Sequence, residues 1–338
     1  MGQAYIARNL SEYISVIKQI TKKIKEVNPR YEVWFRGQED CNYDLSPSGL
    51  RNIKQKNRIQ YMRKDEDVEI PDLSRLLRDF KRKAINNLDN TPSTEIEWLI
   101  IAQHYGLATK LLDWTTNALI GLYFSLPVKK TLEKISAKDL IEIIKENDLS
   151  LDELKNISNE DLYDLKHHRQ YDIDEINEDK LRYRDNARNA AAVYVMSPNI
   201  LNKNAFHVDS PIYVGDEKVA NDMEYFINAN SENYNVILKT ISDNAISDVP
   251  ICINCNETDK RIRNQSGCFT LHGYYCAPLD FYTMFESDIH KIYIPYNSVE
   301  VIRNELKECG INKYFVYQDL NSLSEEINED ELKIFNNK

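Results

Sequence analysis

A long stretch without glycine or proline, Lys129–Asp185, divides this chain of 338 residues into two parts. The stretch holds 11 lysine or arginine residues and 16 aspartate or glutamate residues, with isoleucine and leucine spaced among them. Such a composition is typical of short helices with solvated faces. We therefore expect a charged helical insertion over residues 129–186. The single domain that it interrupts would have its core in residues 30–128 and 187–325.

Helical and strand patterns are mixed irregularly on both sides of this stretch. Apolar residues at three- and four-residue spacing predict helices over residues 10–27, 73–88, 94–105, 117–126, 221–239, 299–309 and 323–335. Runs of β-branched and aromatic residues predict strands over residues 31–35, 110–114, 191–196, 211–214, 250–254, 268–272, 291–294 and 314–317. Because strict alternation is missing, we expect an α+β fold. Its small mixed sheet, of about five to seven strands, would be flanked by helices.

Charge and hydropathy exclude several classes of partner. The net charge is −11, which opposes non-specific binding to nucleic acid or to anionic membranes. No apolar run approaches the ~20 residues of a membrane-spanning helix. The first residues lack the apolar stretch of a signal peptide. We expect a cytoplasmic protein with reduced cysteines, no membrane partner and no strong nucleic-acid signal.

The first segment with polar chemistry is Trp34–Gln38. Arg36 directly follows the predicted strand, and Gly37 and Gln38 come next. A guanidinium at a strand end offers a planar fork of donors for a phosphate or carboxylate, and a glycine beside it lets a ligand approach the backbone. The alternative is an ordinary arginine–acid pair at a turn.

The second segment is AQHYGLATKLLD, residues 102–113. His104 lies in the last turn of a predicted helix that ends at Gly106. Asp113 stands among Leu111, Leu112 and Trp114, so we expect a buried carboxylate, which must have a partner. Arg36 is the first candidate partner, His104 the second, and an arginine of the third segment the next. A structural ion pair is the alternative to a site.

The third segment is Arg261–Phe269, with sequence RIRNQSGCF. Its arginines and Gln265 precede a glycine at the start of a predicted strand, so they could bind a planar, anionic ligand. A solvated hairpin turn would have a similar composition. Nearby, Cys252 and Cys255 have the spacing of a zinc pair, but they overlap a predicted strand, where residues three apart face opposite sides. We therefore predict no metal site.

Taken together, the three segments resemble the FRG domain family, named after a Phe-Arg-Gly motif. The resemblance rests on Phe35-Arg36-Gly37-Gln38, Ser46-Pro47 before Arg51, the run HYGLATKLLDWT at His104–Thr115, LIGLYFS at Leu119–Ser125, RIRNQSGCF at Arg261–Phe269, and Gln318-Asp319-Leu320. Lys110 stands where arginine is commoner in the family, and Gln318 replaces a usual proline. The resemblance spans residues 30–325 but does not include the charged insertion.

The resemblance implies a bacterial or phage-borne cytosolic protein associated with phage-defence or toxin-like modules. The order of an early arginine, a middle polar set and a late amide is also similar to that of ADP-ribosyltransferases, which cleave the glycosidic bond of NAD. Most of those enzymes need a late glutamate, and here Glu257 lies eight residues before Gln265.

Two hypotheses follow. In the first, an effector enzyme acts on NAD or another nucleotide, with NAD as the candidate cofactor. Its catalytic residues would be Arg36, His104, Asp113 and Gln265, and its ligand-binding residues Gly37, Gln38, Tyr105, Gly106, Thr109 and Arg261. In the second, the chain is a non-catalytic sensor or adaptor, whose polar cluster is structural and whose acidic insertion binds a protein partner.

Overall fold

The computed structural model describes residues 3–51, 54–55, 68–69, 71–88, 91–127, 171–173, 187–215, 249–256, 260–273, 277–285 and 287–336. The sheet strands are β1 (Ala4–Ile6), β2 (Trp34–Gln38), β5 (Leu111–Thr115), β8 (Ala190–Met196), β9 (Ile212–Tyr213), β10 (Ile251–Asn254), β11 (Gly267–Leu271) and β12 (Ile289–Pro295). Two-residue strands form two small extra sheets: β3 (Lys54–Gln55) with β4 (Val68–Glu69), and β6 (Tyr171–Asp172) with β7 (Ala187–Arg188).

The helices are α1 (Leu10–Val27), α2 (Leu73–Ala84), α3 (Glu95–His104), α4 (Ala118–Ser125), α8 (Pro198–Phe206), α11 (Lys260–Gln265), α12 (Val299–Glu308), α13 (Lys313–Tyr317) and α14 (Leu320–Asn336). No helix of the described residues is long and apolar enough to cross a lipid bilayer.

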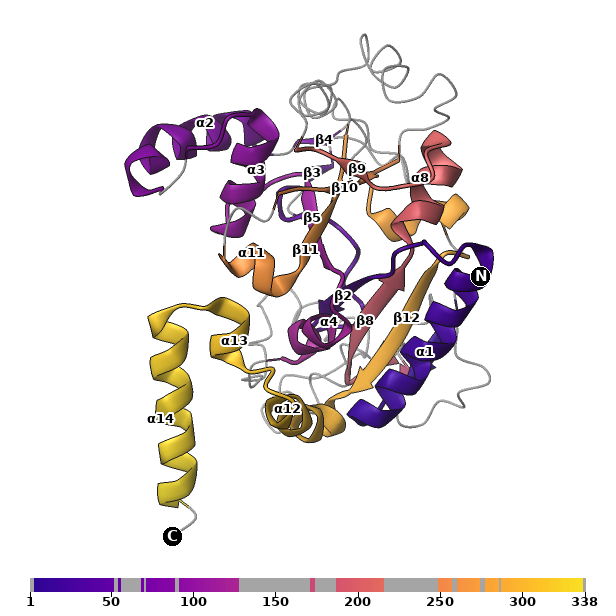
Figure 1. Ribbon diagram of the computed structural model, residues 1–338, viewed down its shortest axis with the longest axis vertical. Helices are drawn as coiled ribbons and strands as arrows, with labels where there is room; N and C mark the ends of the chain where they lie inside the picture. Colours follow the sequence, from indigo (N-terminus) through magenta and orange to yellow (C-terminus); the bar gives the residue numbers. More distant parts are fainter. Residues whose placement is uncertain are drawn as a thin grey trace, which may run out of the picture.

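One mixed sheet of eight strands, in the order β1-β12-β8-β2-β5-β11-β10-β9, organises the fold (Figure 1). The two outer pairs, β1–β12 and β10–β9, are parallel, and all pairs between them are antiparallel. The α+β class with a mixed sheet is confirmed. The sheet exceeds the expected five to seven strands because short strands of three and two residues, β1 and β9, complete its edges.

Each face of the sheet carries its own hydrophobic core. Tyr194 and Met196 of β8 belong to one core, while Val193 and Val195 belong to the other, as strand alternation requires. Helices α3 and α8 contribute apolar residues to the first core, and α1, α4 and α12 contribute to the second. The central strand β8 is therefore apolar on both faces and fully buried.

Local sequence signals set the ends of the helices that position the pocket described below. Thr94 and Glu97 form a capping box at the start of α3. Gly106, with a φ of 84°, lets the chain turn away where α3 ends. Asn117 accepts hydrogen bonds from Leu119 N and Ile120 N and so caps α4.

The structure differs from the sequence predictions in several details. Residues 314–317 are helical, within α13, and not a strand. Residues 260–265 form the short helix α11 where a polar turn was expected. Strand β1 and helix α8 were not predicted. A strand of three residues gives a weak sequence pattern, and so does a helix that begins at a Ser-Pro pair. The predicted strand 31–35 in fact spans Trp34–Gln38, so Arg36 lies inside a strand.

Two predictions fall outside the described residues. The charged insertion over 129–186 includes only residues 171–173 of the described chain, so its helices remain a prediction. The helix predicted over 221–239 also lies outside the described residues. The proposed division of the chain into a core and an insertion likewise stays a prediction.

Candidate functional site

A pocket opens where two central strands of the sheet separate. Strands β2 and β5 share only one registered pair, Phe35 with Thr115. Beyond this pair the side chain of Arg36 reaches across, and its Nη1 donates a 2.7 Å hydrogen bond to the main-chain carbonyl of Asp113. The guanidinium thus satisfies a strand carbonyl that has no strand partner on that side.

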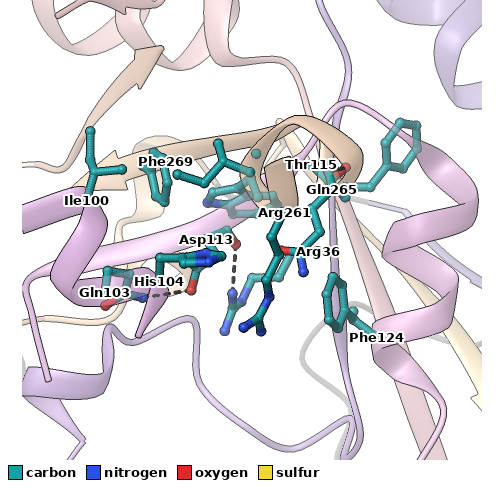
Figure 2. Close-up of a pocket in the computed structure, with 15 residues that line it drawn as sticks. Arg36, Ile100, Gln103, His104, Asp113, Thr115, Phe124, Arg261, Gln265 and Phe269 are labelled. Atoms are coloured by element: carbon teal, nitrogen blue, oxygen red, sulfur yellow. Dashed lines mark hydrogen bonds between the residues drawn. The ribbon is translucent and has the colours of Figure 1, made fainter. Parts of the chain in front are cut away.

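The pocket has a volume of ≈ 280 Å³ and draws its walls from distant parts of the chain (Figure 2). Strands β2, β5 and β11 and helices α3, α4 and α11 all contribute. The lining residues are Phe35, Arg36, Gly37, Ile100, Gln103, His104, Asp113, Trp114, Thr115, Phe124, Arg261, Ile262, Gln265, Gly267 and Phe269. The structure therefore brings Arg36, His104, Asp113 and Gln265 to one pocket.

Gly37 is required because helix α4 crosses β2 at very short range. A Cβ built on Gly37 would lie 2.2 Å from Gly121 O and 2.4 Å from Ser125 N, both backbone atoms. This close approach brings Phe124 of α4 to the wall of the pocket beside Arg36 (Figure 2). The glycine of the Phe-Arg-Gly segment thus acts through packing of α4, although its backbone also lines the pocket.

Arg36 remains a cation in an enclosed place. Burial lowers the pKa of its guanidinium to about 10, and the nearby charge of Asp113 partly opposes this shift. Its Nε is buried and has no hydrogen-bond partner among the described residues. At neutral pH the group is therefore charged.

Asp113 is not the buried carboxylate that the sequence predicted. The residue is exposed, and its side chain faces the pocket while Leu111, Leu112 and Trp114 are buried. Its Oδ2 accepts a 2.7 Å hydrogen bond from Gln103 Nε2 (Figure 2). The expected partner Arg36 binds the main-chain carbonyl of Asp113 instead. The separation of β5 from β2 explains the difference, because it opens this part of the strand to solvent.

Gln103 is a polar residue of the pocket lining that the sequence analysis did not predict. It precedes His104 in the same helix, so the motif containing it was recognised while its own role was not. Its Oε1 accepts a 2.5 Å hydrogen bond from Thr109 Oγ1, which fixes the amide so that Nε2 points toward Asp113. Thr109, predicted to bind a ligand, is buried and supports the pocket from behind.

Arg261 and Gln265 enter the pocket from α11. The Arg261 guanidinium lies over the ring of Tyr317, 4.6 Å from its centroid, in a cation–π contact. Gln265 Nε2 donates to Val316 O at 3.3 Å, and its main-chain carbonyl accepts a 2.6 Å hydrogen bond from Thr115 Oγ1. Helix α13 therefore holds both side chains at the pocket from outside.

Three other predicted ligand-binding residues lie outside the lining. Gln38 is buried and donates to Asp44 O at 3.3 Å. Tyr105 is mostly exposed beside Phe80 of α2, and Gly106 is exposed at the end of α3. The residues absent from the sequence prediction are mainly apolar, with Ile100, Phe124 and Phe269 among them. A single sequence gives no signal that separates such residues from ordinary core residues.

The described residues contain no group of three or more histidine, cysteine, aspartate or glutamate side chains placed to hold a metal ion. Cys252 is fully buried on β10, and burial raises the pKa of its thiol well above its usual value. Burial raises the pKa of the Cys268 thiol in the same way. Protonated, buried thiols of this kind are inert core groups.

The pocket combines features that suit an anionic, partly planar ligand. Two guanidinium groups, of Arg36 and Arg261, and one carboxylate, that of Asp113, line the same pocket. Guanidinium pairs bind phosphate groups with bidentate geometry. The rings of Phe124 and Phe269 are among the other lining groups and can stack on a planar ring (Figure 2).

Comparisons with known proteins add one finding. Residues 31–134 match the family model of the FRG domain. The match includes β2, α3, β5 and α4, which supply most of the pocket wall. No curated protein and no solved structure matches the chain.

Proposed function

We propose that this chain, which contains an FRG domain at residues 31–134, binds NAD or a related nucleotide in the pocket between β2 and β5. The observation that carries the proposal is the placement of two guanidinium groups and one carboxylate in a single aromatic-walled pocket. The three segments that supply these groups are far apart in sequence. The volume of ≈ 280 Å³ lies just under the usual range of ~300–1,000 Å³ for small-molecule sites, so a dinucleotide would extend beyond the pocket.

In this proposal Arg36 and Arg261 bind phosphate oxygens. Gln265 accepts a hydrogen bond from the planar amide or base. Its Oε1 is available for this, because no described residue donates a hydrogen bond to it. The aromatic walls stack on the ring. Because Gln103 orients the Asp113 carboxylate, that carboxylate can stabilise the positive charge that develops on a ribose when its glycosidic bond breaks.

The proposed reaction is cleavage of the glycosidic bond of NAD, in which the nicotinamide leaves with the bonding electron pair. Water or an acceptor side chain then attacks the ribose carbon, and Asp113 or His104 takes the proton from that nucleophile. Asp113 would supply the carboxylate that ADP-ribosyltransferases provide with a late glutamate. By resemblance to FRG proteins, we place this activity in a cytoplasmic defence or toxin-like effector.

The decisive experiment measures binding and turnover separately. Isothermal titration with NAD, ADP-ribose and AMP gives the affinities, and chromatography of NAD incubated with the protein detects released nicotinamide. Arg36→Lys and Arg261→Gln should each weaken binding at least tenfold, since each removes a bidentate donor. Asp113→Asn should bind NAD but release nicotinamide at least a hundredfold more slowly. The exposed Arg30, changed to glutamine, is the matched control.

Thermal unfolding of every variant shows whether it is folded. If the folded wild-type protein neither binds nor consumes any of the three compounds, the proposal is wrong.

A second candidate, a non-catalytic sensor or adaptor, is favoured by one observation. The polar groups of the pocket also tie the scaffold together, as the hydrogen bonds of Arg36 to Asp113 O and of Gln265 to Val316 O show. In that case NAD or ADP-ribose binds without being consumed. The acidic insertion, of which the structure describes only residues 171–173, would then provide the surface for a protein partner.

A further inference from the structure

Two helices of opposite charge stand out from the same edge of the molecule (Figure 1). Helix α2 projects next to α3, and α14 projects beyond α13. Neither helix contributes residues to the lining of the pocket. The surfaces of α2 and α14 that the other described residues leave exposed therefore need an explanation separate from the proposed function.

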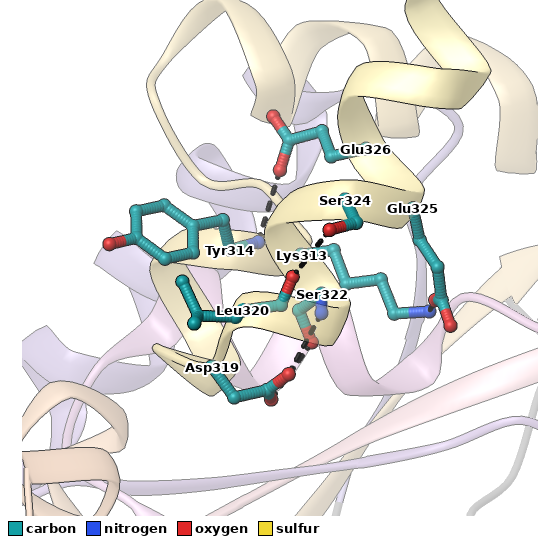
Figure 3. Close-up of polar contacts among 8 residues, drawn as sticks. All are labelled: Lys313, Tyr314, Asp319, Leu320, Ser322, Ser324, Glu325 and Glu326. Atoms are coloured by element: carbon teal, nitrogen blue, oxygen red, sulfur yellow. Dashed lines mark hydrogen bonds and ion pairs between the residues drawn. The ribbon is translucent and has the colours of Figure 1, made fainter.

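Helix α14 is fixed at its beginning by polar contacts at its own first turn and with α13 (Figure 3). Asp319 accepts hydrogen bonds from Ser322 N at 2.8 Å and from Ser322 Oγ at 3.0 Å. Glu326 Oε2 accepts a 3.0 Å hydrogen bond from Tyr314 N, and Lys313 forms an ion pair with Glu325. These contacts set the direction in which the rest of α14 leaves the body.

Beyond this corner α14 exposes large apolar side chains. Ile327 is 59% exposed, Leu332 58% and Phe335 73%. Spacings of five and three residues keep these side chains on one broad side of the helix. Glu329 and Glu331 are exposed among them. Exposed apolar side chains gathered on one helix mark a surface for contact with another protein. The acidic residues among them favour a basic partner.

Helix α2 carries the complementary charge. Arg75, Arg78, Arg82 and Lys83 are exposed, and Asp79 is the one acidic residue of the helix. No residue of α2 is fully buried, so the helix is only partly covered by the body. Beside it, Ile85 and Tyr105 expose 48% and 61% of their surfaces. The α2 surface is thus basic with apolar neighbours.

We propose that α14 of one copy of this chain packs against α2 of a second copy, and that the reverse contact forms in the same dimer. Both helices project at one edge, so a two-fold axis beside that edge pairs each α14 with the α2 of the other copy. Charge complementarity decides against the simpler pairing of α14 with α14. That pairing would place Glu329 and Glu331 of both copies together.

The contact is small and rich in exposed charge, which determines how the dimer behaves. Interfaces of one or two helical turns on each side bury little area and bind weakly. Exposed ion pairs are screened by salt, with a Debye length of about 10 Å at 0.1 M. The dimer should therefore form at micromolar protein concentration and low salt, and dissociate progressively as salt increases.

Sedimentation velocity with charge-reversed variants tests the pairing directly. Each of two variants, R78E/R82E and E329K/E331K, should be monomeric, because each places like charges opposite one another at the exchanged positions of α2 and α14. An equimolar mixture of the two should dimerise again, since both reciprocal contacts then join opposite charges. The fourfold variant in one chain should also dimerise. The exposed lysines of α1, in K18E/K22E, provide the matched control that should dimerise like wild type.

Each remaining outcome overturns the proposal. A wild-type protein that stays monomeric at 100-fold the concentration of the assay has no such dimer. A dimer that survives both reversals uses another surface. Failure of the mixture to reassociate, with both variants folded by circular dichroism, excludes the α2–α14 pairing. Binding of monomeric wild type, but not R78E/R82E, to anionic lipid vesicles would assign α2 to a membrane surface instead.

Discussion

Gln103 holds Asp113 through a 2.7 Å hydrogen bond from its Nε2 to Oδ2 of the carboxylate. The main chain of Leu111 donates to Thr109 Oγ1 at 3.0 Å, and that hydroxyl donates to Gln103 Oε1. In each of these three hydrogen bonds, which group donates and which accepts is therefore fixed. The orientation of the Asp113 carboxylate is set by helix α3 and the loop after it, independently of Arg36.

This relay gives the first prediction. Gln103→Leu and Thr109→Val should each lower the free energy of unfolding by about 1–2 kcal/mol, because each leaves a polar partner unsatisfied. The two changes remove the same hydrogen bond, so the double variant should lose less than the sum. Urea denaturation measures all three values. Additivity within about 0.3 kcal/mol would show that the relay does not exist. Thr116→Val, at an exposed position, is the control.

The second prediction concerns the contact between β2 and α4. Gly37→Ala should lower the free energy of unfolding by about 3 kcal/mol, because the new Cβ meets only backbone atoms that cannot rotate away. Gly267→Ala, also in the pocket wall, is the matched comparison. Its Cβ would find its nearest atom at 3.5 Å, so the change should stay within about 0.5 kcal/mol. Equal thermal stabilities of the two variants would contradict the close packing.

The third prediction is acid sensitivity from a buried histidine. Burial, with the nearby charge of Lys110, lowers the pKa of His272 to about 3. Because the pKa of His272 is lower in the folded state, the unfolded state takes up the proton at a higher pH than the folded state does. The contribution of His272 to the free energy of unfolding is therefore complete above pH ~6.5 and is lost as the pH falls toward 3. Within this range the free energy of unfolding should fall by about 1.4 kcal/mol per pH unit.

The measurement compares wild type with His272→Gln. The variant should show a shallower fall in the free energy of unfolding between pH 6 and pH 3.5 in urea titrations. Asp280 acts in the opposite sense, because burial raises its pKa to about 6, so its contribution is lost as the pH rises through 6. Both proteins contain Asp280, and the difference between them therefore isolates His272. Parallel curves would refute the assignment.

A fourth prediction concerns the support of Arg261 by α13. Tyr317→Leu should lower the free energy of unfolding by about 0.5–1 kcal/mol, the usual value of an exposed cation–π contact. Tyr317→Phe keeps the ring and should retain nearly all of that stability. Chemical denaturation of both variants provides the comparison. If leucine and phenylalanine behave alike, the ring does not hold the guanidinium.

The sequence predicted most of the secondary structure that has strong periodicity. Helices α1, α3, α12 and α14 and strands β8 and β12 all appear close to their expected positions. The aromatic run at 314–317 misled the prediction. Asn312 accepts a hydrogen bond from Phe315 N and so starts a helix there, and packing against α14 overrides the strand propensity of the short run.

The candidate site was predictable in part. Motif patterns predicted five polar residues of one site, and the structure places all five at one pocket. These residues are Arg36, His104, Asp113, Arg261 and Gln265. The exposure of Asp113 could not be predicted. Strand alternation indicates which residues lie on the same face of a sheet, but it does not indicate where two neighbouring strands separate. Gln103 was missed because its importance lies in one hydrogen bond across ten residues.

The sequence by itself determined the helix and strand types, the caps of α3, and the polar residues that a site could use. These properties depend on local backbone preferences and on the periodicity of apolar side chains, which a single chain displays directly. Only the tertiary structure decided that β2 and β5 part after a single pair, that Gln103 orients Asp113, and that α2 and α14 project from one edge. Such relations depend on which distant segments pack together, and the free energy of that packing is shared among residues that no local pattern connects.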